Sequence, residues 1–294
     1  MTENPLRGIA LIVAATICFS LSDTLAKYLT SGLPAVEIAW VRYVVFTLLA
    51  ACPLIFSGRS GIRVRSPGLQ VARGLGVVGS AVLFILALAH LPMAEAATVS
   101  FASPLLITVL AIPLLGEVVG FRGWMAVLAG FAGVLIVVRP GTGGFHPAAL
   151  LVVLSSLCWS LAMILTRKMA GTERPAATLL WTAVTGLVVL SLLLPFSHAP
   201  LGPRQLGLAI VLGLVAATAQ WLAVLAYRHA AASVLAPLSY GQLIWSSSFG
   251  YVVFGSIPDG WTVLGAVIIV GSGLYTVRRE WARLHPRPRL ASAA

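Results

Sequence analysis

Long apolar runs, separated by short polar breaks, make up most of the chain. A helix needs about 20 mostly apolar residues to cross a bilayer, and ten runs approach that length. They are Arg7–Thr30, Ala35–Phe56, Gln70–Ala89, Met93–Gly116, Phe121–Val138, Pro147–Lys168, Ala176–Phe196, Gln205–Tyr227, Ala231–Phe254 and Gly260–Val277. The breaks are rich in Pro, Gly and charge, and the runs lack the short alternation of an outer-membrane barrel. The pattern predicts an all-α membrane protein with ten transmembrane helices.

Composition supports a single membrane domain over residues 1–294. Hydrophobic residues make up 59% of the chain and charged residues 9%, whereas soluble domains carry about 25% charged residues. The three cysteines, Cys18, Cys52 and Cys158, lie inside apolar runs without metal-ligand spacing, so we expect no disulfide. The first run contains Asp23 and Lys27 and no small-residue cleavage site, which indicates a retained helix and not a removed signal peptide.

The net charge of +11 is distributed unevenly between alternate breaks. If the N-terminus is cytoplasmic, the outer breaks hold only Arg139 and Arg204, and Lys27 and Arg42 fall within helices. The inner side holds Arg7, Arg59, Arg63, Arg65, Arg73, Arg122, Arg167, Lys168, Arg174, Arg228, Arg278, Arg279, Arg283, Arg287 and Arg289. Because Lys and Arg concentrate in cytoplasmic loops, both termini are expected to be cytoplasmic. The basic residues serve orientation and lipid contact, and nucleic acid is not an expected partner.

The two halves of the chain repeat one another. Thr16–Lys27 reads TICFSLSDTLAK, and 140 residues later Ser156–Arg167 reads SLCWSLAMILTR. At an offset of 139, His90 matches His229, Gly116 matches Gly255, and Phe101 corresponds to Tyr240. We therefore expect one five-helix repeat over 7–140, a second over 147–279, and a basic cytoplasmic tail over 280–294. An odd number of helices inverts the second copy, an arrangement typical of secondary transporters with a binding site between the halves.

Three features carry a resemblance to a known family: Lys27 late in the first helix, the Arg42–Tyr43 pair, and the segment ATVSFASPLLITVLAIPLLGE ending at Glu117. With them the chain resembles the EamA-type transporters of the drug/metabolite transporter superfamily. The resemblance implies ten helices in two repeats, and it is strongest to bacterial exporters of aromatic amino acids of the YddG type. The second copy departs from the pattern, because Ser256 follows Gly255 and Leu243 stands where Pro104 would recur.

Charged residues within a bilayer are costly and are usually paired or functional. Asp23 and Lys27 have i, i+4 spacing and could pair, with Glu37 and Arg42 at similar depth in the next helix. A four-member network of this kind would either brace the first two helices or gate the outer mouth and hold a zwitterion. Glu95 would be interfacial or a proton site.

Polar and aromatic side chains at helical spacing suggest a central cavity. The predicted substrate-binding residues are Ser20, Phe84, Ser100, Phe101, Ser103, Trp159, Gln220, Ser239, Tyr240, Gln242 and Ser246. The alternative is that the serines and glutamines join helices to one another. Pro104 and Pro237 are expected to act as hinges, because proline bends a helix.

The chain has no GxSxG, HExxH or Walker motif, so neither an enzyme nor a resident cofactor or metal is expected. The sequence thus predicts a secondary transporter in the bacterial inner membrane. It would export amino acids, aromatic or hydrophobic ones foremost, or related metabolites, by alternating access. An exporter of cationic drugs or of nucleotide sugars is the alternative. Proton coupling and oligomeric state stay open, and a monomer is compatible with the sequence.

Overall fold

A computed structural model describes residues 5–57, 64–116, 118–141, 144–169, 172–197, 199–229, 235 and 238–284. All regular structure in these ranges is helical. The elements are α1 (Pro5–Leu29), α2 (Ala35–Ser57), α3 (Pro67–Leu88), α4 (Met93–Ser100), α5 (Ser103–Leu115), α6 (Phe121–Val138), α7 (Ala148–Lys168), α8 (Pro175–Leu193), the 3₁₀ turn η2 (Leu194–Phe196), α9 (Pro203–His229), α11 (Gln242–Phe254) and α12 (Gly260–Leu284).

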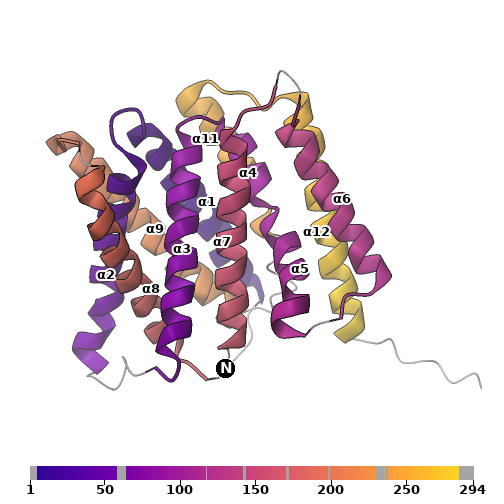
Figure 1. The fold of residues 1–294 in the computed structure, drawn as a ribbon, viewed down its shortest axis with the longest axis horizontal. Coiled ribbons are helices and arrows are strands. Elements are labelled where there is room, and N and C mark those ends of the chain that lie inside the picture. The colour runs from indigo at the N-terminus through magenta and orange to yellow at the C-terminus, as the bar shows by residue number, and fades with distance from the viewer. Residues whose placement is uncertain are drawn as a thin grey trace, which may run out of the picture.

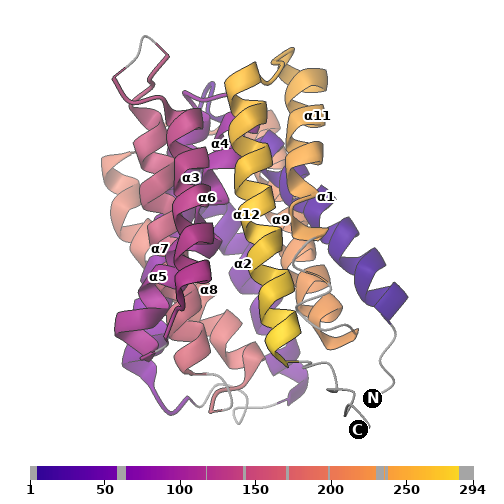
Figure 2. The same ribbon diagram turned by 90° about the vertical axis from the view of Figure 1, so that its right-hand side faces the viewer.

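Successive spans cross the molecule in alternate directions, with α4 and α5 together forming one span (Figure 1). The start of α1 and the end of α12 lie at the same end of the bundle, called the terminal end below; the other is the opposite end (Figure 2). Seven helical spans in the described residues are long and apolar enough to cross a membrane, and two shorter apolar helices lie in α6 and α12.

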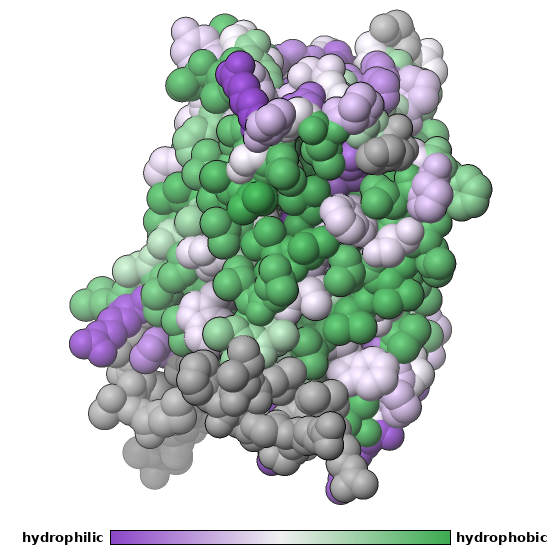
Figure 3. Space-filling view, turned by 90° about the vertical axis from the view of Figure 1, so that its left-hand side faces the viewer, coloured by the Kyte–Doolittle hydropathy of each residue, from purple (hydrophilic) through white to green (hydrophobic). Residues whose placement is uncertain are grey.

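A hydrophobic band surrounds the bundle between two more polar ends, as Figure 3 shows for one side. Large apolar side chains face outward in this band; Leu48 on α2 and Leu192 on α8 are each 68% exposed. Such a surface would be unstable in water and is matched to lipid tails. The chain is therefore an integral membrane protein.

Helix pairing follows the two halves of the chain. α1 packs along α9, and α3 packs along α7. Equivalent helices make equivalent contacts. The contact of α2 with α9 matches that of α8 with α3, and the contact of α1 with α11 matches that of α7 with α5. In two further contacts, α2 with α8 and α6 with α12, a helix of the first half packs against its own equivalent in the second half.

Glycines permit the closest helix contacts, as expected for membrane helices. A β-carbon at Gly76 on α3 would come within 2.8 Å of the Cys158 carbonyl oxygen on α7, and one at Gly133 on α6 within 2.9 Å of Ile269 on α12. Gly116 and Gly255 end α5 and α11 with φ of 71° and 65°, a left-handed conformation that favours glycine. These two caps stand at the positions matched by the 139-residue offset.

The structure corrects two predicted boundaries and the position of Pro104. The run Met93–Gly116 is two helices, because Phe101 and Ala102 interrupt it. Pro104 consequently lies in the first turn of α5, where its missing N–H costs nothing, and not at a bend inside one helix. In addition, α12 continues to Leu284, so the first residues of the predicted tail are helical. Pro237 and most of the run before α11 lie outside the described residues.

Candidate translocation site

The two helix interruptions meet inside the bundle. Phe101 follows α4, and Tyr240 comes two residues before α11. Their rings lie 4.9 Å apart between centroids at an interplanar angle of 35°. The chain makes i→i+3 hydrogen bonds at both places, from Phe101 N–H to the Thr98 carbonyl (3.2 Å) and from Leu243 N–H to the Tyr240 carbonyl (3.0 Å). The structure therefore brings together the two residues that the repeat matched at an offset of 139.

Two of the predicted serines, Ser20 and Ser246, join helices in this structure. Ser20 and Ser246 are fully buried, and their hydroxyl oxygens lie 3.2 Å apart across the α1–α11 contact. In the matching α7–α5 contact, Ser160 donates to the Ser103 carbonyl at 3.1 Å. Ser100 and Ser103 each donate to a carbonyl within their own segment, at 2.7 Å. Helix joining, the alternative raised from sequence, accounts for the Ser20–Ser246 and Ser160–Ser103 contacts, whereas the bonds donated by Ser100 and Ser103 are local.

Asp23 and Lys27 lie on one face of α1 but contact different partners. The Gln242 side-chain amide on α11 donates to the Asp23 carboxylate at 3.3 Å, and Arg42 on α2 attracts the same carboxylate. The Lys27 ammonium donates to the carbonyls of Leu88, at 2.8 Å, and of Leu91.

Lys27 also lies 5.5 Å from the centroid of the Phe254 ring at the end of α11. It thus caps the C-terminus of α3, where a cation is favoured by the helix dipole. Sequence reasoning missed Phe254, because nothing in its local pattern relates it to α1.

Glu37 contacts the connection between α8 and α9. It is 1% exposed, and its carboxylate accepts the Ala199 N–H at 3.0 Å, which fixes the connection between α8 and α9 over α2. Of the predicted four-member network, the structure shows Arg42 attracting Asp23, Lys27 capping α3 and Glu37 accepting from the α8–α9 connection.

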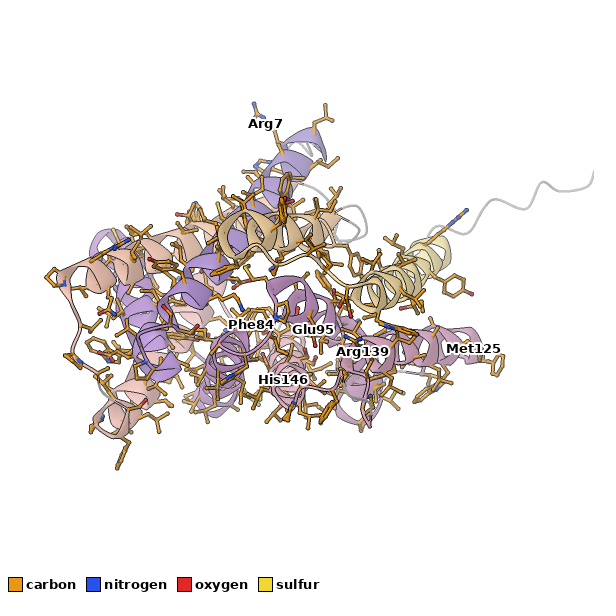
Figure 4. All side chains as sticks on the ribbon, turned by 90° about the horizontal axis from the view of Figure 1, so that it is seen from above. Arg7, Phe84, Glu95, Met125, Arg139 and His146 are labelled. Carbon is orange, nitrogen blue, oxygen red and sulfur yellow. The ribbon has the colours of Figure 1, made fainter. Side chains whose placement is uncertain are left out.

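Glu95 lies at the opposite end beside an ion pair that the sequence did not reveal. Arg139 and Asp259 are 2.6 Å apart, and Glu95 on α4 is attracted by Arg139 and repelled by Asp259. Figure 4 shows Glu95 and Arg139 next to one another, with Phe84 and His146 nearby. The Asp259 carboxylate also accepts the Thr262 N–H at 2.8 Å and so caps α12. Burial raises the pKa of Asp259, but the hydrogen bonds from Thr262 and the Arg139 charge outweigh it and hold the pKa below its ordinary value.

The remaining candidates are partly buried and placed around this interior. Phe84 packs against the main apolar core, while Trp159 on α7, Gln220 on α9 and Ser239 before Tyr240 are partly exposed. A separate depression of about 360 Å³ opens at the opposite end, between the end of α1 and the start of α9, with Tyr28, Gly32 and Gln205 in its lining. Among the described residues, no group of three His, Cys, Asp or Glu side chains could hold a metal ion.

One basic residue is placed differently from the prediction. Arg73, counted among the cytoplasmic positions, lies within α3 and is 6% exposed. Its inclusion in the apolar run Gln70–Ala89 was the signal that it belongs to a helix.

Comparison with known proteins identifies the family. The model of the EamA-like transporter family matches the chain twice, over residues 6–139 and 146–278. The chain belongs to the EamA-like transporter family. A solved crystal structure with 21% identity shares the fold, with a TM-score of 0.62 over 97% of this chain and 99% of that one.

Several curated relatives of this EamA-like protein are named transporters. It is 28% identical to the S-adenosylmethionine uptake transporter of Rickettsia prowazekii, covering 94% of each chain. It is 32% identical to the riboflavin transporter of Rhizobium johnstonii, over 94% of this chain and 92% of the relative. It is 26% identical to the pseudopaline exporter CntI of Pseudomonas aeruginosa, over 90% and 93%. These relatives support transport of small metabolites and no enzymatic role.

Proposed function

We propose that this EamA-like protein is a secondary transporter that exports amino acids, aromatic or hydrophobic ones foremost, or related small metabolites. The observation that carries the proposal is the Phe101–Tyr240 stack, which joins the interrupted helices of the two halves at 4.9 Å. Stacked rings favour a flat or apolar part of a solute. Helix interruptions in transporters free backbone groups that can bind the polar part.

Alternating access between two inverted five-helix repeats accounts for the arrangement. Support comes from the two family-model matches, from the matched glycine caps, and from contacts that recur when the halves are exchanged. On this proposal ten segments cross the membrane, with the repeats at 7–140 and 147–279. The solute is held between the repeats while one end closes and the other opens.

The side chains near the stack suit a zwitterion with an apolar body. Asp23, supported by Gln242, would accept an ammonium group, and Arg42 is the cation available to a carboxylate. Phe84, Trp159 and Gln220 would line the remaining wall. Lys27 and Glu95 would act at the opposite end, where Lys27 joins α1 to α3.

The inner membrane of a bacterium is the proposed location, with the terminal end in the cytoplasm. The helix ends at the terminal end carry Arg7, Arg65, Arg167, Lys168 and Arg174, whereas those at the opposite end carry Arg139 and Arg204. This distribution agrees with the preference of Lys and Arg for cytoplasmic loops.

A second candidate is uptake of a larger ring-containing metabolite. It is favoured by the similarity to proteins named as S-adenosylmethionine and riboflavin transporters, of which the first are named as uptake systems. The direction of transport therefore has to be measured and not assumed.

The test is flux through purified protein in liposomes, measured in both directions with and without a pH gradient. The labelled panel would hold aromatic and aliphatic amino acids, riboflavin, S-adenosylmethionine and one lipophilic cation. The proposal expects the aromatic amino acids to exchange fastest. Movement of the lipophilic cation alone would refute it, and movement of riboflavin or S-adenosylmethionine alone would favour the second candidate.

A further inference from the structure

A seam of polar side chains joins the terminal half of α3 to α7, α8 and the turn between them. At the surface, the Glu173 carboxylate accepts the N–H groups of Arg65 and Ser66, at 2.8 and 2.9 Å, at the start of α3. One turn deeper, the Gln70 amide donates to the Thr178 hydroxyl at 3.1 Å. Deeper still lies Arg73. Every contact in this seam connects the first half of the chain to the second.

Arg73 is a buried cation held by neutral hydroxyl groups. Its guanidinium donates to the Thr166 hydroxyl at 2.6 Å and to the Thr182 hydroxyl. Both threonines in turn donate to carbonyls of their own helices at 2.7 Å, so their hydroxyl protons do not depend on Arg73. Burying an arginine is unfavourable without strong compensation, and neutral oxygens compensate less than a carboxylate would.

Gln70 adds a second buried polar group that is incompletely satisfied. The side chain is fully buried, and its carbonyl oxygen Oε1 has no hydrogen-bond partner. A buried acceptor without a hydrogen-bond partner costs free energy, and a hydrogen bond from water would remove that cost. The closed seam therefore holds two groups, Arg73 and Gln70 Oε1, that gain by contact with water.

The corresponding contact in the other half is apolar at the same depth. α9 packs on α1 and α2 as α3 packs on α7 and α8. There the buried positions are Ala209 and Leu212, both fully buried, and Gly213, where a β-carbon would meet Val45 at 2.8 Å. A permanent helix contact at this depth can thus be built without charge, so helix packing alone does not account for Arg73 and Gln70.

We propose that the α3 seam is the gate at the terminal end of the pathway, shut in this structure and opened when water reaches Arg73 and Gln70. This inference rests on the proposed transport function. In the open state α3 separates from α7 and α8, and hydration of the two groups offsets the reduced packing. At the surface, the hydrogen bonds to Glu173 hold the gate closed. Deeper in the seam, hydration of Arg73 determines the free energy of opening.

Replacing Arg73 with methionine tests the gate against a purely structural brace. Arg73→Met keeps the length of the side chain and leaves no unpaired threonine proton, so the closed seam becomes apolar and harder to open. The protein should keep or raise its melting temperature while its transport rate falls about tenfold, equivalent to 1.4 kcal/mol. Arg73→Lys should retain most of the rate, and Arg204→Met, at an exposed position of the opposite end, should leave both quantities unchanged. A large drop in thermal stability in Arg73→Met would overturn the gate in favour of a brace.

A second measurement needs no transported solute. In a background with Cys18, Cys52 and Cys158 replaced by alanine, Thr178→Cys should react with a membrane-impermeant methanethiosulfonate reagent from the terminal end. Adding Arg73→Met should slow that reaction, while Ile269→Cys, buried between α6 and α12, should stay protected throughout. If Thr178→Cys is as protected as Ile269→Cys, the seam does not open and the inference fails. If the seam opens but no panel solute moves, the proposed cargo fails and the gate stands.

Discussion

The spacing of Lys27 from Asp23 suggested an ion pair, whereas the structure shows Lys27 in other contacts. Replacing Lys27 tests which of the two holds. The structure has its ammonium on the carbonyls of Leu88 and Leu91, with the Phe254 ring beside it. Lys27→Met preserves the aliphatic part of the side chain and removes the donors. We expect both carbonyls to be left without a buried partner, which destabilises the link between α1 and α3.

The magnitude follows from the interactions that a methionine side chain cannot make. Two hydrogen bonds from a charged group contribute about 1.5–3 kcal/mol each, and the cation–π contact adds ~0.5–1 kcal/mol. Desolvation of a half-buried lysine offsets part of this sum, which leaves a net destabilisation of about 2–3 kcal/mol. For a chain of this size the melting temperature should fall by roughly 5–10 °C.

The assay is thermal unfolding of purified protein in detergent, with Arg204→Met as the matched control for removal of one positive charge at the same end. A double-mutant cycle with Asp23→Asn then separates the two interpretations. Because Asp23 contacts Gln242 and Lys27 contacts α3, the two side chains share no hydrogen-bond partner, and the coupling energy should stay below about 1 kcal/mol. A coupling well above ~1 kcal/mol, or a Lys27→Met variant as stable as the wild type, would refute the capping contacts.

Three further predictions concern stability. Asp259→Asn should lower stability by up to about 1 kcal/mol at neutral pH, through removal of a half-exposed ion pair. Because the folded pKa of Asp259 is depressed, that difference is fully present above the unfolded pKa near ~3.9 and is lost as pH falls through the lower folded pKa, so it should shrink in unfolding followed from pH 7 down to the acid transition. Gly76→Val should cost about 1–3 kcal/mol through overpacking against Cys158, whereas Gly271→Ala, with open space around its β-carbon, should cost nothing in the same thermal assay. Gly116→Ala and Gly255→Ala should each cost about 1–2 kcal/mol because alanine is strained at positive φ, and a difference of several kcal/mol between them would contradict their equivalence.

The apolar runs predicted the helices well, because lipid imposes length and composition on a spanning segment. The repeat matched Phe101 with Tyr240 by offset, and the structure adds that their rings lie 4.9 Å apart. Local pattern could not show that Phe101 and Ala102 end a helix, because the run stays apolar through the interruption and Pro104 is equally consistent with a bend. In the structure Pro104 begins a helix instead of bending one, and its role as a hinge stays a prediction.

Partners from distant segments lay beyond sequence reasoning. The spacing of Asp23 and Lys27 allows a pair, but the carbonyls at the end of α3 and the Gln242 amide compete for the same groups, and only the packing decides between them. Arg73 was counted with the loop charges because a basic residue near the end of an apolar run looks alike whether it faces the membrane surface or another helix. The Arg139–Asp259 pair joins segments that are far apart along the chain, so no local pattern could reveal it.

The most direct test of the central claim is flux through the Phe101–Tyr240 stack. Phe101→Ala and Tyr240→Ala would each be compared with wild type for exchange of the labelled panel in liposomes, with Tyr251→Ala, an aromatic residue 59% exposed toward lipid, as the control. If the stack is the centre of the pathway, each central variant should bind its solute about tenfold more weakly, equivalent to 1.4 kcal/mol, while Tyr251→Ala exchanges like the wild type. Unchanged exchange in both central variants would contradict a pathway between the two halves at this point.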